Sequence, residues 1–252
     1  MSKNQKGQHC EISYINAGDS CVIMMLGNEI SREMHQRVKS LYLYLNSHQI
    51  PGVVEVVPAY RSISVYYNPF EASPNKIFEW LQQTDGMVLP NASENSVRRL
   101  YIPVCFGGEF GPDLQRVAEY HNLSEKEVVD IFQAQYYLNY FVGFMPGKPY
   151  LGGLPEILET PRLDVPRFKL PSGTVVIYSK QAAIFGIEQP SGANCIGRSP
   201  ILIYDIRKED PTLFQMGDMV RFFPISQEEF LEISAQVEAM EYHVRTEYVK
   251  ER

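Results

Sequence analysis

The chain is poor in the residues that mark several common classes of protein. Its four cysteines, Cys10, Cys21, Cys105 and Cys195, are scattered and form no C-x-x-C pair. We therefore expect neither a disulfide framework nor a metal site, and free thiols in a reducing compartment are the default. Basic residues are in deficit, with 23 Lys and Arg against 30 Asp and Glu. This balance argues against nucleic acid as a partner, because neutralising phosphates requires a basic surplus.

Long apolar runs are also missing. No segment approaches the roughly 18 apolar residues of a membrane-spanning helix. The first ten residues, MSKNQKGQHC, are polar and lack the apolar core of a signal peptide. We therefore expect a cytoplasmic protein that does not interact with membranes. The 252 residues are enough for one large domain or two smaller ones.

The first hundred residues alternate strand-like runs with two amphipathic helices. Apolar residues recur every three or four positions over residues 31–48, which predicts a helix with one buried stripe. Ser73 followed by Pro74 marks the start of a second helix that continues to Gln83. The order strand, strand, helix, strand, strand, helix predicts a small α+β domain with its helices on one face. We place this domain at residues 8–95, because the polar stretch 91–99 has the composition of a boundary.

The second part, residues 96–242, mixes helices with many short strands. A helix should begin after residues 111–113, and capping boxes at residues 124–127 and 226–229 predict two more. Between them lie strand-like runs separated by turn formers, which together predict a β-barrel or sandwich. The last residues, 243–252, form a charged tail that we expect to fray. A strand at residues 100–104 either closes the sheet of the first domain or begins this one. The further expected strands are residues 174–178, 182–187, 201–204 and 219–223.

The most unusual segment is residues 143–173, which is dense in proline and glycine. This density argues against a regular helix or a central strand, so we expect a backbone fixed by turns. Two Pro-Arg pairs place Arg162 and Arg167 in this stretch, and Arg198 lies in a later turn. Arginine forks on a rigid loop are suited to carboxylates or phosphates. A solvated surface loop, or a salt bridge from Asp164 to one arginine, is equally compatible with the pattern.

Other chemistry is excluded by spacing. Residues 143–148, GFMPGK, are too short between their glycines for a phosphate-binding P-loop, and Pro149 stands where the motif needs Ser or Thr. No G-x-S-x-G elbow of a serine hydrolase is present. Cys195 has no histidine nearby in the sequence to activate its thiol, so a buried thiol is favoured.

The ordered motifs resemble those of the KipI/PxpB family, which comprises the B subunit of 5-oxoprolinase, allophanate hydrolase subunit 1 and kinase A inhibitor-like proteins. The resemblance covers nearly the whole chain and is strongest over residues 102–225. The elements that carry it are residues 107–114 (GGEFGPDL), residues 143–155, the two Pro-Arg pairs, residues 171–173 (PSG), Gln181, residues 190–192 (PSG), residues 196–200 (IGRSP) and residues 217–222 (GDMVRF).

The resemblance implies a fold, a function and partners. The second domain would be a cyclophilin-like β-barrel that follows a small α+β domain, so the fold class is α+β. The protein would be a non-autonomous subunit of an ATP-dependent amide hydrolase that opens 5-oxoproline to glutamate. A KipA/PxpC-like subunit and a LamB/YcsF-like PxpA protein would be its partners, and the complex would use ATP. The alternative is a KipI-like regulator that binds and inhibits a sensor histidine kinase.

The resemblance also assigns candidate site residues without naming a catalytic one. Candidates for substrate binding are Arg162, Arg167, Gln181, Gly192 and Arg198, and the candidate pocket loop contains Pro146, Gly147, Lys148 and Tyr150. Some family positions are changed here, because Phe132 stands where the family has a histidine and Lys148 where it has a phenylalanine. This altered pocket is what keeps the regulatory alternative open.

Overall fold

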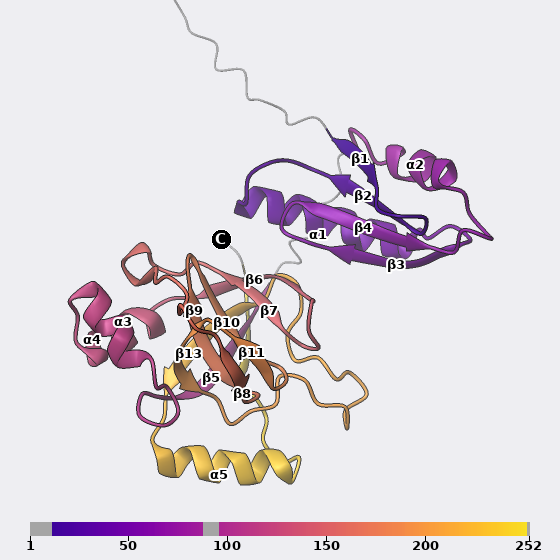
Figure 1. Cartoon of the computed structure of the whole chain (residues 1–252). Helices are drawn as coiled ribbons and strands as arrows, with labels where there is room; N and C mark the ends of the chain where they lie inside the picture. The colour runs from indigo at the N-terminus through magenta and orange to yellow at the C-terminus, as the bar shows by residue number, and fades with distance from the viewer. Residues whose placement is uncertain (1–11, 88–95, 251–252) are drawn as a thin grey trace, which may run out of the picture. The chain divides into compact units, whose positions relative to one another are not determined.

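The computed structural model describes residues 12–87 and 96–250, and the chain divides into two compact units between residues 94 and 95 (Figure 1). Part of the expected boundary stretch, residues 91–95, lies outside the described residues. The first unit contains β1 (Ser13–Asn16), β2 (Cys21–Met25), α1 (Arg32–Ser47), β3 (Val53–Pro58), β4 (Ser62–Tyr67) and α2 (Pro74–Gln82).

The first unit is an antiparallel sheet with two helices packed on it. Its strand order is β1-β2-β4-β3. Along β4, Ile63 and Val65 are fully buried while Tyr66 is exposed, so one face of the sheet carries the core. Ser31 and Ser73 accept backbone hydrogen bonds as N-caps of α1 and α2, because their hydroxyl oxygens satisfy free amides of the first turn.

The second unit is built around a closed ring of seven strands, β12-β9-β10-β7-β6-β13-β5, which β12 closes by pairing with the end of β5. Its strands are β5 (Val97–Phe106), β6 (Tyr137–Val142), β7 (Pro149–Gly152), β9 (Thr174–Tyr178), β10 (Gln181–Ile184), β12 (Asn194–Arg198) and β13 (Met219–Pro224). Outside the ring lie the ribbon of β8 (Arg167–Leu170) and β11 (Gln189–Ser191), the edge strand β14 (Thr246–Val249), and the helices α3 (Leu114–His121), α4 (Glu125–Gln133), η1 (Glu156–Leu158) and α5 (Gln227–Glu238).

Aromatic side chains from α4, β6 and β13 pack together in the core of the second unit. Phe132 is fully buried, and its ring centroid lies 5.0 Å from that of Tyr137 and 5.2 Å from that of Phe222. The Tyr137 hydroxyl donates a 3.0 Å hydrogen bond to the Phe132 carbonyl, which removes the cost of burying it. Phe132 is therefore part of the core and not of a site.

Both expected capping boxes are present, at the starts of α4 and α5.

Two expectations about the second unit are wrong. The stretch 143–173 contains the strands β7 and β8, because short strands fit between its prolines and Pro149 is the first residue of its strand. Residues 201–204 form only one isolated bridge, Tyr204 to Thr212. Their alternating pattern reflects Ile201 and Ile203 packing into the core without strand pairing.

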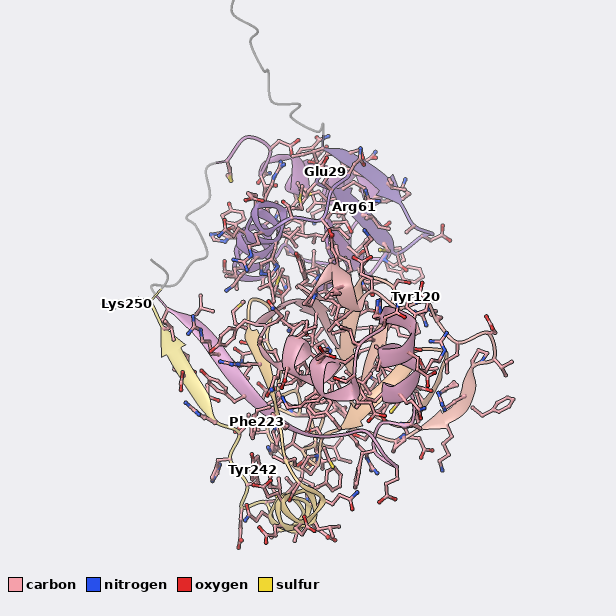
Figure 2. The ribbon with its side chains drawn as sticks, turned by 90° about the vertical axis from the view of Figure 1, so that its left-hand side faces the viewer. Glu29, Arg61, Tyr120, Phe223, Tyr242 and Lys250 are labelled. Carbon is pink, nitrogen blue, oxygen red and sulfur yellow. The ribbon has the colours of Figure 1, made fainter. Side chains whose placement is uncertain are left out.

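The charged tail does not fray over its whole length. Residues 246–249 pair with the first residues of β5 as strand β14, and Figure 2 shows β14, which ends beside Lys250, alongside β5. Thr246, Tyr248 and Val249 favour a strand, and β5 offers them an edge that β12 covers only at its other end. In the part of the chain described, no helix is both long and apolar enough to cross a membrane.

Candidate anion-binding site

A cavity of about 400 Å³ opens in the second unit beside the ends of β9 and β11. This volume is in the range of small-molecule sites. Its walls combine aromatic rings, prolines and a few polar groups. The lining residues are Phe144, Lys148, Arg162, Pro166, Tyr178, Phe185, Gln189, Pro190, Ser191 and Gly192.

Arg162 reaches this cavity from a loop whose backbone is fixed on both sides. Its guanidinium lies 4.4 Å from the centroid of the Tyr178 ring, so the side chain is held by a cation–π contact. The loop therefore presents an oriented arginine, not a freely moving one. The backbone around it is held by Ser179 N to Thr160 O (2.7 Å), Asn194 Nδ2 to Pro161 O (2.9 Å) and Leu163 N to Gly192 O (2.7 Å).

Lys148 enters the cavity from the tight turn 143–148. Gly147 adopts a φ of +67°, and a Cβ there would lie 2.7 Å from the Cβ of Tyr204, so only glycine fits. The Lys148 Nζ atom lies 5.2 Å from the ring centroids of both Phe144 and Tyr150. Tyr150 is in turn stacked on Phe141, with centroids 4.3 Å apart. The turn thus places the ammonium group between two rings at the cavity wall.

The charge of the two cations is not balanced within the described part of the chain. Among the described residues, no carboxylate lines the cavity, and Asp164 forms no ion pair with either nearby arginine. Burial of Lys148 and the charge of Arg162 lower the pKa of the Lys148 amine. Burial raises the pKa of the Tyr178 hydroxyl, which stays neutral and able to donate a hydrogen bond. The cavity is therefore suited to an anion, which would supply the missing charge.

Arg167 does not line the cavity. Its two terminal nitrogens each donate a 2.6 Å hydrogen bond to the carboxylate of Asp113. The same carboxylate accepts a 2.8 Å hydrogen bond from the backbone of Cys195. Asp113 stands at the N-cap of α3 but makes no capping bond, because its oxygens are used here. Arg167 therefore ties the β8 ribbon to the barrel.

Of the other predicted residues, only Gly192 lines the cavity, and the rest lie outside its lining. Arg198 donates from Nε to the Ser172 carbonyl at 3.2 Å and lies over Phe230, outside the cavity. Gln181, on β10 opposite Tyr178, is also outside it. Pro146 and Gly147 shape the turn without lining the cavity. Gly192 does line it, but a Cβ there would meet nothing closer than 3.6 Å, so close backbone approach does not require this glycine.

Sequence reasoning missed several cavity residues. Tyr178 ends a strand that the pattern did predict, and Gln189 directly precedes the Pro190-Ser191-Gly192 motif. Gln189 is a buried polar residue on a short strand, which is an informative signal only once its neighbours are known. Phe144 and Phe185 contribute rings, and aromatic residues alone do not distinguish a wall from a core.

The fold and cavity define the class of this protein: an α+β unit followed by a β-barrel unit with a cation-lined cavity. Residues 12–214 match the family model described as carboxyltransferase domain, subdomain C and D. The B subunit of the 5-oxoprolinase of Bacillus subtilis (strain 168) is 35% identical over 222 residues, covering 84% of this chain and 92% of the relative. The chain belongs to this carboxyltransferase-domain family, and the resemblance to the KipI/PxpB family is confirmed.

Solved structures agree on the architecture. TTHA0988 is 30% identical with a TM-score of 0.72, and the match covers 82% of this chain but only 40% of that one. The urea amidolyase of K. lactis shares the fold at 17% identity and a TM-score of 0.77, over 97% of this chain and 17% of its own length. This chain thus corresponds to a part of each of these two larger proteins.

Proposed function

We propose that this chain is the B subunit of an ATP-dependent 5-oxoprolinase-type hydrolase, which opens the lactam of 5-oxoproline to glutamate. The observation that carries the proposal is the cavity in which Lys148 and Arg162 lack a counter-charge from the described residues. The substrate is a small ring that bears one carboxylate, and its size and charge match this cavity. The similarity to the B. subtilis protein adds support.

Each cavity group has a role in this proposal. Arg162 would receive the carboxylate on its planar fork, and Lys148 would complete the charge balance as a point charge. The side chains of Tyr178 and Gln189 would form hydrogen bonds with the polar atoms of the lactam ring. Phe185, which is 2% exposed, would support the ring from the core side. These interactions bind and orient the substrate, and the chain would hold it while partner residues complete the reaction.

The proposal includes partners and a co-substrate. The B. subtilis relative is one component of a multi-subunit enzyme, so this chain should also act within a complex. We infer that a KipA/PxpC-like subunit and a LamB/YcsF-like PxpA protein complete the complex, and that the complex consumes ATP. This chain has no P-loop, so ATP is expected to bind mainly through a partner. We also infer that the barrel is of the cyclophilin-like type and that the protein acts in the cytoplasm.

The test is reconstitution with single cavity variants. The chain is co-expressed with its KipA/PxpC-like and PxpA-like partners, and ATP-dependent release of glutamate from 5-oxoproline is measured. We expect Arg162→Gln to lower kcat/KM by roughly 10- to 100-fold, which corresponds to one lost charge-assisted hydrogen bond. Lys148→Gln should give a smaller loss, because its ammonium acts as a single point charge.

The matched control is Lys180→Gln, which removes a cation from an exposed turn next to Tyr178. Lys180 does not line the cavity and pairs with Glu159 at 3.8 Å. Its turnover should equal that of the native complex. A stable three-component complex without any turnover would overturn the proposal. Inhibition of a sensor histidine kinase by the isolated chain would instead support the regulatory alternative.

A further inference from the structure

A second group of charged side chains lies on the outer face of the barrel, away from the cavity. We name it the arginine–tyrosine patch. It consists of residues on β5, β13 and β14 and of the residues directly before β6 and β14: Arg99, Tyr101, Tyr136, Arg221, Arg245 and Glu247.

Strand register explains why these side chains meet. Arg221 on β13 is the partner of Tyr101 on β5, and Glu247 on β14 is the partner of Arg99. The residues between them, Leu100 and Val220, are buried in the core. Because side chains alternate across a strand, the patch residues must point outward. The sheet thus places charged and aromatic groups of three adjacent strands side by side.

The guanidinium groups of the patch are ordered by tyrosine rings. Arg99 and Arg221 lie 4.7 Å and 5.4 Å from the centroid of Tyr136, and Arg245 lies 4.3 Å from that of Tyr101. Such contacts fix the side chains before any partner arrives, which lowers the entropic cost of binding. Arginine and tyrosine are also the residues that most often dominate binding at protein interfaces.

The charges of the patch do not balance. Among the patch residues there are three guanidinium groups and one carboxylate, that of Glu247. That carboxylate already accepts hydrogen bonds from the Tyr101 hydroxyl at 2.7 Å and from Arg245 at 2.6 Å. Arg221 donates to the carbonyl of Gln133, and the Nε atom of Arg99 is buried without a hydrogen-bond partner among the described residues. A buried donor without a partner is uncommon in native proteins.

Counting protons shows which groups remain to bind a ligand. The Tyr101 hydroxyl has one hydrogen and donates it to Glu247, because a carboxylate can only accept. The Tyr136 hydroxyl, 3.0 Å away, therefore donates to the Tyr101 oxygen. Both hydroxyl hydrogens are used within the patch. Any further acceptor must therefore be bound by the guanidinium groups, which bind carboxylates and phosphates through paired hydrogen bonds.

We propose that the arginine–tyrosine patch is a docking surface for an acidic segment of a partner protein. A surplus of positive charge on a chain with a net charge of −7 concentrates attraction for carboxylates at this one face. The patch lies on the outside of a sheet, and none of its residues lines the cavity of Lys148 or the 230 Å³ cavity beside α5. An open surface of this kind fits an extended acidic peptide better than a small metabolite.

The test is binding of an octaglutamate peptide to the full chain, with octaglutamine as the neutral probe. We expect octaglutamate to bind, with an affinity that falls as NaCl is raised. The double variant Arg99→Gln/Arg221→Gln should lower the affinity by at least tenfold, because each arginine contributes a charge-assisted hydrogen bond. Replacing both arginines with lysine should give an intermediate loss, because the charge remains and the fork is lost.

The matched control is Arg32→Gln, which removes one exposed cation from α1 and should leave the affinity unchanged. Circular dichroism melting shows whether each variant is folded at the assay temperature, and the lysine pair supplies the test if the glutamine pair unfolds. Equal binding of octaglutamate and octaglutamine, or unchanged affinity in a folded double variant, would overturn the proposal. So would binding of inorganic phosphate as tight as that of octaglutamate, or a native dimer that the substitutions dissociate.

Discussion

Arg162 and Arg167 share the same local sequence, a proline followed by an arginine, but have opposite surroundings. The fork of Arg167 is closed on Asp113 by two hydrogen bonds of 2.6 Å. The fork of Arg162 rests on the ring of Tyr178 and meets no carboxylate of the described residues. One arginine therefore holds the fold together, and the other is available to a ligand.

The difference is set by residues far away in the sequence. Asp113 comes from the start of α3, 54 positions before Arg167, and Tyr178 comes from β9 after it. Neither partner could be assigned from the Pro-Arg pairs. A Pro-Arg pair thus predicts an arginine on a rigid backbone. Whether that arginine has a structural or a binding role depends on the residues that contact it in the folded protein.

The largest expected effect is a difference in the free energy of unfolding between variants of the two arginines. Arg167→Ala leaves the Asp113 carboxylate, which is 6% exposed, without its cation. Breaking a buried pair costs about 3–5 kcal/mol, and the partial exposure of Arg167 reduces this to about 2–4 kcal/mol. Arg162→Ala should change the free energy of unfolding by less than about 0.5 kcal/mol. Urea titration of both variants measures the contrast, and equal destabilisation would abolish it.

A second arginine that is paired with a carboxylate, Arg207 with Asp205, allows the contribution of such a pair to stability to be tested by changing the pH. Arg207 holds the carboxylate of Asp205 with two hydrogen bonds of 2.8 Å. The side-chain hydrogen bonds from Arg207 lower the pKa of Asp205 to about 2. Since the ordinary value is near 3.9, this stabilisation is complete above pH 4 and is lost as the pH falls towards 2. Because Arg207 is more than a third exposed, we expect about 1 kcal/mol.

The measurement compares native protein and Asp205→Asn by urea unfolding at pH 6 and at about pH 2.5. Other carboxylates titrate in both proteins, so the difference between the two isolates Asp205. The variant should be less stable than native protein at pH 6, and this difference should be clearly smaller near pH 2.5, where Asp205 begins to take up a proton in the folded state. A difference that stays constant over this range would show that the pair contributes no charge interaction.

Local signals in the sequence predicted much of the fold. The N-cap Ser73 and both capping boxes form as expected, because a cap depends on only four consecutive residues. Closure of the barrel could not be predicted, because it depends on pairing between β5 and β12, about ninety residues apart. The tail strand β14 was missed for the same reason.

The candidate site was predicted in part. Arg162, Lys148 and Gly192 were named from the sequence and all line the cavity. Nothing in the sequence separated Arg167 and Arg198 from Arg162. In the structure, however, Arg167 is hydrogen-bonded to Asp113 and Arg198 to the carbonyl of Ser172. The sequence indicates which side chains can bind an anion. Whether such a side chain is already paired with a carboxylate depends on its neighbours in the folded protein. The relevant signal, absence of a nearby carboxylate, exists only in three dimensions.

The smallest expected effect tests whether the charges of Arg162 and Lys148 interact with each other. Burial and the charge of Arg162 both lower the pKa of the Lys148 amine. Arg162→Gln removes only the second cause, so the pKa of Lys148 should rise and still remain below its usual value. Reductive methylation with ¹³C-formaldehyde gives each lysine an NMR signal that can be followed against pH. The signal of Lys180, which is exposed, paired with Glu159 and outside the cavity lining, is the internal control.

Adding 5-oxoproline to the native chain should also raise the pKa of Lys148, because a bound carboxylate favours the charged amine. In Arg162→Gln the same addition should have less effect, because the ligand loses its fork. An unchanged Lys148 titration in the variant would mean that the two cations are electrostatically independent. In that case the open fork of Arg162 and the turn of Lys148 would have to be treated as separate features of the surface, and the shared anion site would be lost.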